Sequence, residues 1–338
     1  MIAFLPARGA GDTSPGISTR YEDCCMNITV MLATYKRNEI LSRTLDSFCD
    51  IITDGLSWEI FVVDNHGDPK TEQLVLGFTN RLPIRYLVEK KRGKNNALNK
   101  AVKLATGDLF VFTDDDVIAD HHWLLEMWDG SARWPDVSVF GGRILPQYPP
   151  GTKSPISEAH KFFKGAYVVV NWDTGEGHCP PHKVWGPNMA IRSTVFLEGW
   201  QFNPDIGPNG DNYIMGSETE LLMKLEESGM NAVFLPNALV YHQIRREQLE
   251  VAWLYGRAFR YGRSMAQLYE LPKAIYWFNA PRYLFRKLFE TAIRRIIYCY
   301  DYDKRIDLGI NYWILKGNIY QYRQRAKQEC LDAGERTG

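Results

Sequence analysis

Three consecutive carboxylates, Asp114, Asp115 and Asp116, are the residues of this sequence that point most directly to chemistry. They follow the apolar run at residues 109–113, which has the composition of a strand buried on both faces. Ligands of open α/β sheets bind at the carboxyl ends of strands. Adjacent negative charges repel, and a Mg²⁺ or Mn²⁺ ion, which prefers oxygen ligands, would compensate them. A solvated acidic turn that caps the next helix is the structural alternative.

Polar residues also follow two other predicted strands. Thr34 and Tyr35 follow the apolar run at residues 28–32, and Asp64 follows residues 59–63. At such a point a tyrosine can stack on a base, and an aspartate can accept a hydrogen bond from a base or ribose. An ordinary turn residue is the alternative for each position. Because the three strand ends meet at one crevice, we expect these side chains to form a nucleotide site.

A basic segment, residues 89–96, lies between the third predicted strand and the next helix. Its Lys94 and Arg92 could meet a diphosphate near the metal, and a solvated basic loop is the alternative. The segment has no P-loop pattern, so an ATPase of that type is excluded.

Short apolar runs alternate with helical periodicity along most of the chain, which predicts an α/β fold with a largely parallel sheet. The predicted strands are residues 28–32, 59–63, 84–88, 109–113 and 137–141. Helical spacing is present around residues 40–48 and 97–105, from residue 121, and at residues 217–228, where Gly229 suits a C-terminal cap. Seven prolines punctuate residues 146–188, which predicts loops over a site.

Composition excludes several classes of protein. Hydrophobic residues make up 45% and charged residues 24%, as in globular proteins, and 40 basic residues balance 40 acidic ones. A globally basic nucleic-acid binder is therefore not expected. The six cysteines have no C-x-x-C spacing, which favours reduced thiols in a cytosolic protein over zinc or disulfides. The sequence has no run of about 18 apolar residues, so we expect no membrane-spanning helix.

The end of the chain differs from the rest. Residues 281–329 hold 11 Lys or Arg against 5 acidic residues, and residues 283–297 fit an amphipathic helix. Basic and aromatic residues together suit a membrane surface. A helix packed on the main domain with a solvated basic face is the alternative.

The order of the motifs resembles that of family-2 glycosyltransferases, which have the nucleotide-sugar-binding GT-A fold. The resemblance covers roughly residues 28–265 and depends on several weak motifs in the right order. The matching stretches are residues 32–37, 62–65, 93–99, 107–116, 185–192 and 216–221, with Tyr241 and His242 downstream.

The resemblance implies a role for each matching position. Tyr35 and Asp64 would hold the uracil or other base, Asp114 would face the ribose, and Asp116 would bind the metal. His242 falls where the family has a late metal or phosphate contact. The donor-binding set that we expect from the residues and the resemblance is Thr34, Tyr35, Asp64, Lys94, Asp114, Asp115 and Asn188.

Glu218 matches the general base of the family's Glu-Asp pair, although that pair reads Ser217-Glu218 here. Glu220 is the other candidate base. The structural alternative is a capping box in which Ser217 is the N-cap and Glu220 the third helical residue. Two further departures are Leu98, where the family has an arginine, and Glu247, where processive synthases have a tryptophan.

The expected architecture is an α/β GT-A fold, Rossmann-like, with a mixed, mostly parallel sheet flanked by helices and a C-terminal helical extension. Its predicted parts are a loose tail (1–26), a GT-A domain (27–265) and a basic aromatic extension (266–338). The expected activity is the inverting, Mg²⁺- or Mn²⁺-dependent transfer of a sugar from a nucleotide-diphosphate donor, a UDP-sugar by expectation, to a glycan or glycolipid acceptor. This would serve surface polysaccharide or glycolipid assembly in the cytoplasm, with peripheral contact to the inner membrane face. A sugar nucleotidyltransferase and a non-catalytic nucleotide-sugar-binding scaffold are the alternatives.

Overall fold

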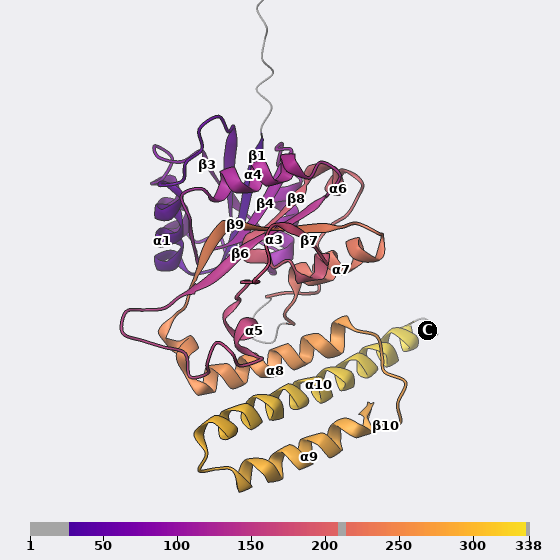
Figure 1. Cartoon of the computed structure of the whole chain (residues 1–338). Helices are drawn as coiled ribbons and strands as arrows, with labels where there is room; N and C mark the ends of the chain where they lie inside the picture. Colours follow the sequence, from indigo (N-terminus) through magenta and orange to yellow (C-terminus); the bar gives the residue numbers. More distant parts are fainter. Residues whose placement is uncertain (1–26, 209–213, 336–338) are drawn as a thin grey trace, which may run out of the picture.

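The structure is a computed structural model that describes residues 27–208 and 214–335, with side chains up to residue 328. The predicted tail at residues 1–26 lies outside the described residues, as do Cys24 and Cys25. The remaining chain forms a sheet domain and, below it in Figure 1, a layer of three long helices.

Four parallel strands form one half of the central sheet, in the order β3-β2-β1-β4. They are β1 (Ile28–Thr34), β2 (Trp58–Asp64), β3 (Ile84–Val88) and β4 (Leu109–Asp114). These are the first four strands that the apolar runs predict, and they are confirmed to within two residues. In β1, Val30 and Leu32 face one layer of helices, while Met31 faces the other. A strand with helices on both faces must be apolar along its whole length, which explains the continuous runs.

The other half of the sheet is mixed, and β8 pairs antiparallel with β4. Its strands are β8 (Met189–Arg192), β6 (Val139–Gln147), β9 (Ala232–Gln243), β5 (Val117–Ala119) and β7 (Gly177–Cys179). The register of β5 against β9 places Val117 opposite His242. This pairing brings the end of β9 next to the acidic loop that follows β4.

Helices cover both faces of the sheet, so the domain has three layers (Figure 1). One face carries α1 (Asn38–Phe48), α2 (Pro69–Leu76) and α4 (Trp123–Arg133), and the other carries α3 (Lys94–Val102), α6 (Ser193–Leu197) and α7 (Ser217–Glu227). Helix α7 ends as the sequence predicts, because Gly229 has a φ of +90° and the Met230 N–H donates to the Leu225 carbonyl.

The proline-rich stretch consists mainly of loops after residue 147, as predicted. Its short elements are α5 (Phe163–Tyr167), β7, and the 3₁₀ turns η1 (Pro181–Lys183) and η2 (Gly186–Asn188). Among the described residues this stretch contains no helix longer than five residues.

The helical layer contains α8 (Val251–Leu268), α9 (Arg282–Ile297) and α10 (Tyr302–Glu335), and the 3₁₀ turn η3 (Arg246–Leu249) leads into it. Between α8 and α9, β10 (Tyr276–Trp277) and β11 (Ala280–Pro281) form a small hairpin. The domain boundary proposed from the sequence, at residue 265, lies inside α8.

Glycines let two of these helices cross closely. A Cβ at Gly317 would lie 2.1 Å from the Phe259 carbonyl oxygen, and one at Gly262 would lie 2.1 Å from the Ile314 carbonyl oxygen. A separate apolar cluster, including Phe163, Leu254 and Ile310, joins α5, α8 and α10. The helical layer is therefore packed on the sheet domain through side chains of its own core.

Within the described residues, no helix is both long and apolar enough to cross a membrane.

Candidate functional site

The acidic loop after β4 is held from two sides by elements far away in the sequence. The Thr44 hydroxyl of α1 donates to the Asp115 carbonyl at 2.8 Å, and the Gln243 N–H at the end of β9 donates to the Asp116 carbonyl at 2.8 Å. Asp115 and Asp116 are both buried. The structure therefore keeps these carboxylates close together in a fixed conformation, and a solvated acidic turn, the structural alternative, is excluded.

Asp115 points toward the start of α1. It accepts hydrogen bonds from the Thr34 hydroxyl at 2.8 Å and from Arg37 Nη1 at 3.0 Å. Burial raises the pKa of Asp115 to about 6, although Arg37 opposes that shift. Thr34 and Asp115 thus bond to each other, and their expected contact with a donor remains a prediction.

Asp116 is surrounded by three nitrogen-bearing side chains. Its Oδ2 lies 3.3 Å from Arg37 Nη1 and 3.3 Å from Arg245 Nη1, and its Oδ1 lies 3.6 Å from His242 Nε2. Burial alone would raise the pKa of Asp116, but the His242, Arg37 and Arg245 side chains hold it well below its usual value. The carboxylate is therefore ionised at any physiological pH.

The hydrogen bond on the far side of His242 fixes how its ring faces Asp116. Its Nδ1 lies 2.8 Å from the Tyr167 carbonyl oxygen, which can only accept, so Nδ1 carries a proton and donates. With a proton kept on Nδ1, Nε2 can offer its lone pair to a cation held between the ring and the Asp116 carboxylate. Metal-ligating histidines commonly donate their second ring nitrogen to a backbone carbonyl in this way.

Residues of this kind fit a divalent cation that is only partly held by protein. No cluster of three or more His, Cys, Asp or Glu with metal-site geometry occurs among residues 27–208 and 214–335. Mg²⁺ and Mn²⁺ at nucleotide sites usually take one or two protein ligands and complete their shell with phosphate oxygens and water. Asp116 and His242 can supply such a pair.

Lys94 connects the acidic loop to α7. Its ammonium group, at the start of α3, donates to Asp114 Oδ1 and to Glu218 Oε1, the latter at 2.5 Å. Burial would lower the pKa of Lys94, but the two carboxylates raise it, so the group stays protonated. Burial raises the pKa of Asp114, and Lys94 opposes that shift. In this structure Lys94 neutralises two carboxylates, while its expected phosphate contact remains a prediction.

Glu218 lies in the first turn of α7. Its Oε1 accepts from Lys94, and its Oε2 accepts from the Ser217 hydroxyl at 2.6 Å. Burial would raise the pKa of Glu218, but Lys94 and Ser217 lower it. The side chain is thus ionised at neutral pH, which is the form a general base requires.

The capping box that the sequence allowed at α7 is wrong. The N-cap residue is Gly216, with a φ of +96° and no side-chain cap, and Ser217 is the first helical residue. Glu220 Oε1 instead lies 2.5 Å from Lys224 Nζ, one turn along the helix. The Ser217 hydroxyl is used to hold Glu218, because it bonds to that carboxylate and not to the backbone of the first turn.

Gly186 makes room for Glu218. A Cβ at Gly186 would lie 2.5 Å from both Cδ and Oε1 of Glu218. Any larger residue in this turn must therefore displace the carboxylate.

The expected base site lies at the outer end of β1 and β2. Tyr35 is 36% exposed, its ring packs edge-on against His66, and its hydroxyl accepts a hydrogen bond from Arg92 Nη2 at 2.7 Å. Asp64 is fully buried and accepts from the backbone N–H of His66 and of Asp68, each at 2.8 Å. Asp64 Oδ2, which bonds to Asp68, also accepts from the Tyr86 hydroxyl at 2.9 Å.

Asn188 lies in the interior. Its amide oxygen accepts from Trp123 Nε1, and its amide nitrogen donates to the carbonyls of Arg143 and Ala238, all at 2.8 Å. The side chain is fully buried, so its hydrogen bonds fix the 3₁₀ turn η2 at its junction with β8. A donor contact in this turn would have to come from its neighbours.

Arg37 and Arg245 contact Asp116, although the sequence motifs assign neither residue a role at the site. Arg37 was inside the first matching stretch, and Arg245 follows His242 by three residues. Arg245 also pairs with Glu247, with Nε and Oε1 2.5 Å apart. The pairing of β5 with β9 brings this second arginine to Asp116, which the sequence does not reveal.

Comparison with solved structures identifies the fold class of this chain. A mannosyltransferase of Pyrobaculum calidifontis, solved with GDP-Man and Mn²⁺, superposes with a TM-score of 0.51 at 17% identity over 92% of this chain and 80% of that one. Staphylococcus aureus TarS residues 1–349, solved with UDP-GlcNAc, superposes with a TM-score of 0.51 at 14% identity over 88% and 92% of the two chains. The fold is the GT-A fold.

Sequence comparison points to one family of enzymes. Residues 29–187 match the family described as Glycosyl transferase family 2. A glucosyl-dolichyl phosphate glucuronosyltransferase of Haloferax volcanii is 25% identical over 246 residues, which are 71% of this chain and 76% of that protein. A validoxylamine A glucosyltransferase of Streptomyces hygroscopicus is 30% identical over 60% of this chain, which spans only about half of that relative's length (48%). Residues 29–187, just under half of the chain, are thus similar to glycosyltransferase family 2, and this similarity favours a glycosyltransferase over a sugar nucleotidyltransferase.

Proposed function

We propose that this protein transfers a sugar, with inversion, from a nucleotide-diphosphate sugar to a hydroxyl of a glycolipid or polysaccharide acceptor. The single observation that carries the proposal is the geometry at the carboxyl edge of the sheet. There Asp116 faces His242 Nε2 at 3.6 Å, and the ionised Glu218 is linked to the same acidic loop through Lys94.

Asp116 and His242 would hold a Mg²⁺ or Mn²⁺ ion. When bound, the ion supplies positive charge against the diphosphate leaving group. The guanidinium groups of Arg37 and Arg245, each 3.3 Å from Asp116, would lie near the same diphosphate and stabilise the charge that develops on it. Two neighbours of the same fold, the mannosyltransferase and GalNAc-T7, were solved with Mn²⁺, which supports this assignment.

Glu218 would act as the general base. An acceptor hydroxyl is a poor nucleophile at neutral pH, and a carboxylate within about 2.6–3.2 Å can take its proton as the bond forms. In this step the acceptor oxygen bonds to the anomeric carbon, the bond from that carbon to the diphosphate breaks, and the proton passes to Glu218. A single in-line displacement inverts the configuration of the anomeric carbon.

Lipid-linked acceptors are favoured by the relatives. The names of the Haloferax volcanii protein and of a dolichol-phosphate mannosyltransferase of Pyrococcus furiosus, which matches 27% of this chain, both specify dolichyl or dolichol phosphate. We propose that the present protein also acts on a lipid-linked acceptor, at the cytoplasmic face of a membrane. A UDP-sugar is the proposed donor, as in the TarS complex.

A screen of nucleotide sugars, with and without Mn²⁺, tests the proposal. A ligand that binds only the folded protein raises its melting temperature. We expect one donor to stabilise the protein in a Mn²⁺-dependent manner and to be consumed when extracted lipid acceptor is added. Donor binding without any turnover would favour the non-catalytic scaffold, and the absence of any stabilising donor would contradict the proposal.

A further inference from the structure

Helix α9 is the outermost element of the helical layer and carries an apolar face that nothing in the described chain covers (Figure 1). Phe289, Ile293, Ile296 and Ile297 are 68%, 42%, 75% and 64% exposed. Their spacing of four, three and one residues places them on one side of the helix. The opposite side, with Leu284, packs against α10. Soluble proteins rarely leave such a contiguous face open to water unless it binds something.

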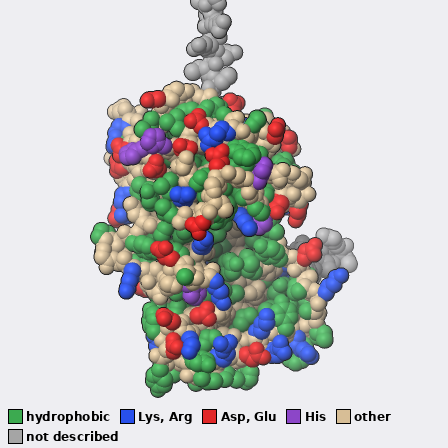
Figure 2. Space-filling model, in the orientation of Figure 1, with side chains coloured by type: hydrophobic (Ala, Val, Ile, Leu, Met, Phe, Trp, Pro, Cys, Tyr) green, Lys and Arg blue, Asp and Glu red, His purple; other side chains and the backbone are tan. Residues whose placement is uncertain are grey.

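The exposed face extends beyond both ends of α9. Before the helix, the hairpin presents Trp277 and Phe278, which are 51% and 78% exposed, and after it Tyr300 is 97% exposed. Figure 2 shows hydrophobic side chains along the lower edge of the molecule, in the region of α9, with Lys and Arg and some Asp and Glu beside them. Aromatic residues at the two ends of an apolar stripe are typical of segments that lie at a membrane interface.

The charges on α9 are mostly positive. Helix α9 contains five basic residues and one acidic residue. Glu290 forms the only ion pair that the described residues give to this helix, with Oε1 3.6 Å from Arg286 Nε. An excess of positive charge beside an apolar stripe matches an anionic lipid surface. It also argues against a second copy of this chain as the occupant, because two such faces would repel each other.

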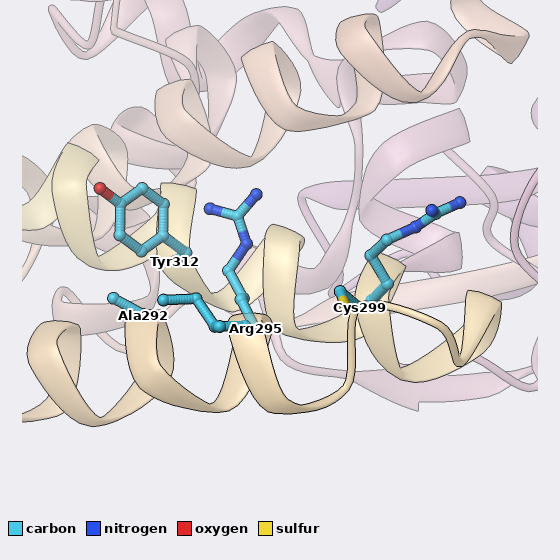
Figure 3. Close-up of a pocket in the computed structure, with 6 residues that line it drawn as sticks. Ala292, Arg295, Cys299 and Tyr312 are labelled. Carbon is cyan, nitrogen blue, oxygen red and sulfur yellow. The ribbon is translucent and has the colours of Figure 1, made fainter.

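An open pocket of about 450 Å³ lies at the same end of the helix pair. Its six lining residues, drawn in Figure 3, come from α9, the following turn and α10, and they are Ala292, Arg295, Ile296, Cys299, Arg305 and Tyr312. The lining contains two arginines and no carboxylate, and Ile296 also belongs to the exposed face.

Among the side chains that the structure describes, neither pocket arginine has an acidic partner. The guanidinium carbon of Arg295 lies 4.7 Å from the Tyr312 ring centre and 5.9 Å from that of Tyr255. That of Arg305 lies 5.5 Å from the Tyr302 ring centre. No ion pair within the described part of the chain joins either arginine to a carboxylate, so both retain donors for an anion. A phosphate group beside an apolar wall has the chemistry of a phospholipid headgroup.

We infer that α9 docks on an anionic lipid bilayer, with its apolar face at the acyl boundary and a headgroup phosphate in the Arg295–Arg305 pocket. This docking deepens the proposed function, and it rests on that function only for the lipid-linked nature of the acceptor. The helical layer connects directly to the site, since η3 and α8 follow Arg245 along the chain. Docking through α9 would therefore hold the sheet domain at a fixed distance from the membrane surface.

Vesicle flotation of the full chain tests the inference without any sugar transfer. The vesicles are phosphatidylcholine alone or phosphatidylcholine with phosphatidylglycerol, at low salt. The test variant is Phe289→Ser with Ile296→Ser, and the matched control is Leu197→Ser in α6, where the leucine is 85% exposed on the sheet domain. Exposed positions are chosen so that folding is preserved, which equal melting temperatures would verify.

We expect wild type and Leu197→Ser to float with the anionic vesicles and much less with the neutral ones. The double variant should bind at least about tenfold more weakly, because about 25 cal/mol is lost per Å² of apolar surface no longer buried. Arg295→Gln with Arg305→Gln should remove most of the preference for anionic lipid, whereas Arg43→Gln on α1 should not.

Three results would overturn the inference: no flotation of wild type at low salt, equal binding by the double variant, or concentration-dependent dimers that the double variant abolishes. Failure of the proposed function looks different. A chain that floats normally but uses no lipid-linked acceptor would contradict the acceptor and leave the docking surface intact.

Discussion

Replacing Glu218 by glutamine removes the proposed base while leaving its shape in place. In the structure Glu218 Oε1 accepts from Lys94 at 2.5 Å and Oε2 accepts from Ser217 at 2.6 Å. The amide oxygen of a glutamine can still accept from Lys94, and the Ser217 hydroxyl can rotate to accept from the amide nitrogen. Lys94 keeps its bond to Asp114, so no buried charge is left alone. We therefore expect the free energy of unfolding to fall by about 1 kcal/mol or less.

The effect on turnover should be far larger than the effect on stability. Loss of general-base assistance lowers the rate by about 10²–10⁴-fold. At about 1.4 kcal/mol per factor of ten, the activation barrier rises by about 3–5 kcal/mol. The assay is release of nucleotide diphosphate in the presence of saturating donor and acceptor, with donor affinity measured separately by calorimetry. Donor affinity and melting temperature should change little, because Glu218 would contact the acceptor.

Glu220→Gln is the matched control, two residues along the same helix. Glu220 Oε1 pairs with Lys224 at 2.5 Å, so its loss should cost a little stability and leave turnover near that of wild type. If Glu218→Gln retained more than about a tenth of wild-type turnover, against the loss expected for a base, the reasoning would be refuted. A large loss in Glu220→Gln alone would transfer the role to that residue.

Two further substitutions test the surroundings of the site and the fold. Gly186→Ala places a Cβ 2.5 Å from Glu218 Cδ, so we expect turnover to fall by about tenfold to a hundredfold. The control is Gly175→Ala, where nothing lies within 4 Å of the added Cβ, and its turnover should equal that of wild type. Equal turnover of the two variants would show that Gly186 is not needed to make room for Glu218. The second is Glu176→Gln. Glu176 accepts hydrogen bonds from Arg133 at 2.9 and 2.6 Å, and these bonds lower its pKa. The ionised carboxylate therefore stabilises the fold at any pH above the pKa of the unfolded chain, about 4.3. That stabilisation is lost as the pH falls through the lower pKa of the folded protein. Urea unfolding should show a cost of about 1 kcal/mol at neutral pH that shrinks below about pH 4, and a cost independent of pH would contradict it.

The parallel half of the sheet was predictable because each of its strands is buried on both faces and reads as a continuous apolar run. Strand β9 was not predicted, although it is the longest strand, with 12 residues. Pro236 and Asn237 interrupt its pattern, and the pairing with β6 skips from Leu235 to Leu239 with a register shift at Gly142. A proline inside a strand is tolerated at such an irregularity, which the sequence alone does not announce.

The contacts of the candidate site were predictable where its residues share one short motif and unpredictable where distant segments meet. The acidic triplet was located from its sequence, but the contact of Arg245 with Asp116 depends on how β9 pairs with β5. Asn188 shows the opposite limit, because a buried asparagine with all its hydrogen bonds satisfied looks the same in sequence as one that binds a ligand.

Calorimetric titration of the selected nucleotide diphosphate into wild type and Asp116→Asn, with Mn²⁺ and with EDTA, tests whether Asp116 holds a divalent cation for the donor. The variant should fold, because Arg37 retains Asp115 and Arg245 retains Glu247 as partners. We expect Mn²⁺ to tighten nucleotide binding to wild type at least about tenfold and to have no effect on Asp116→Asn, by analogy with the cost of removing metal ligands and their supporting groups. The same Mn²⁺-dependent affinity in both proteins would contradict this expectation.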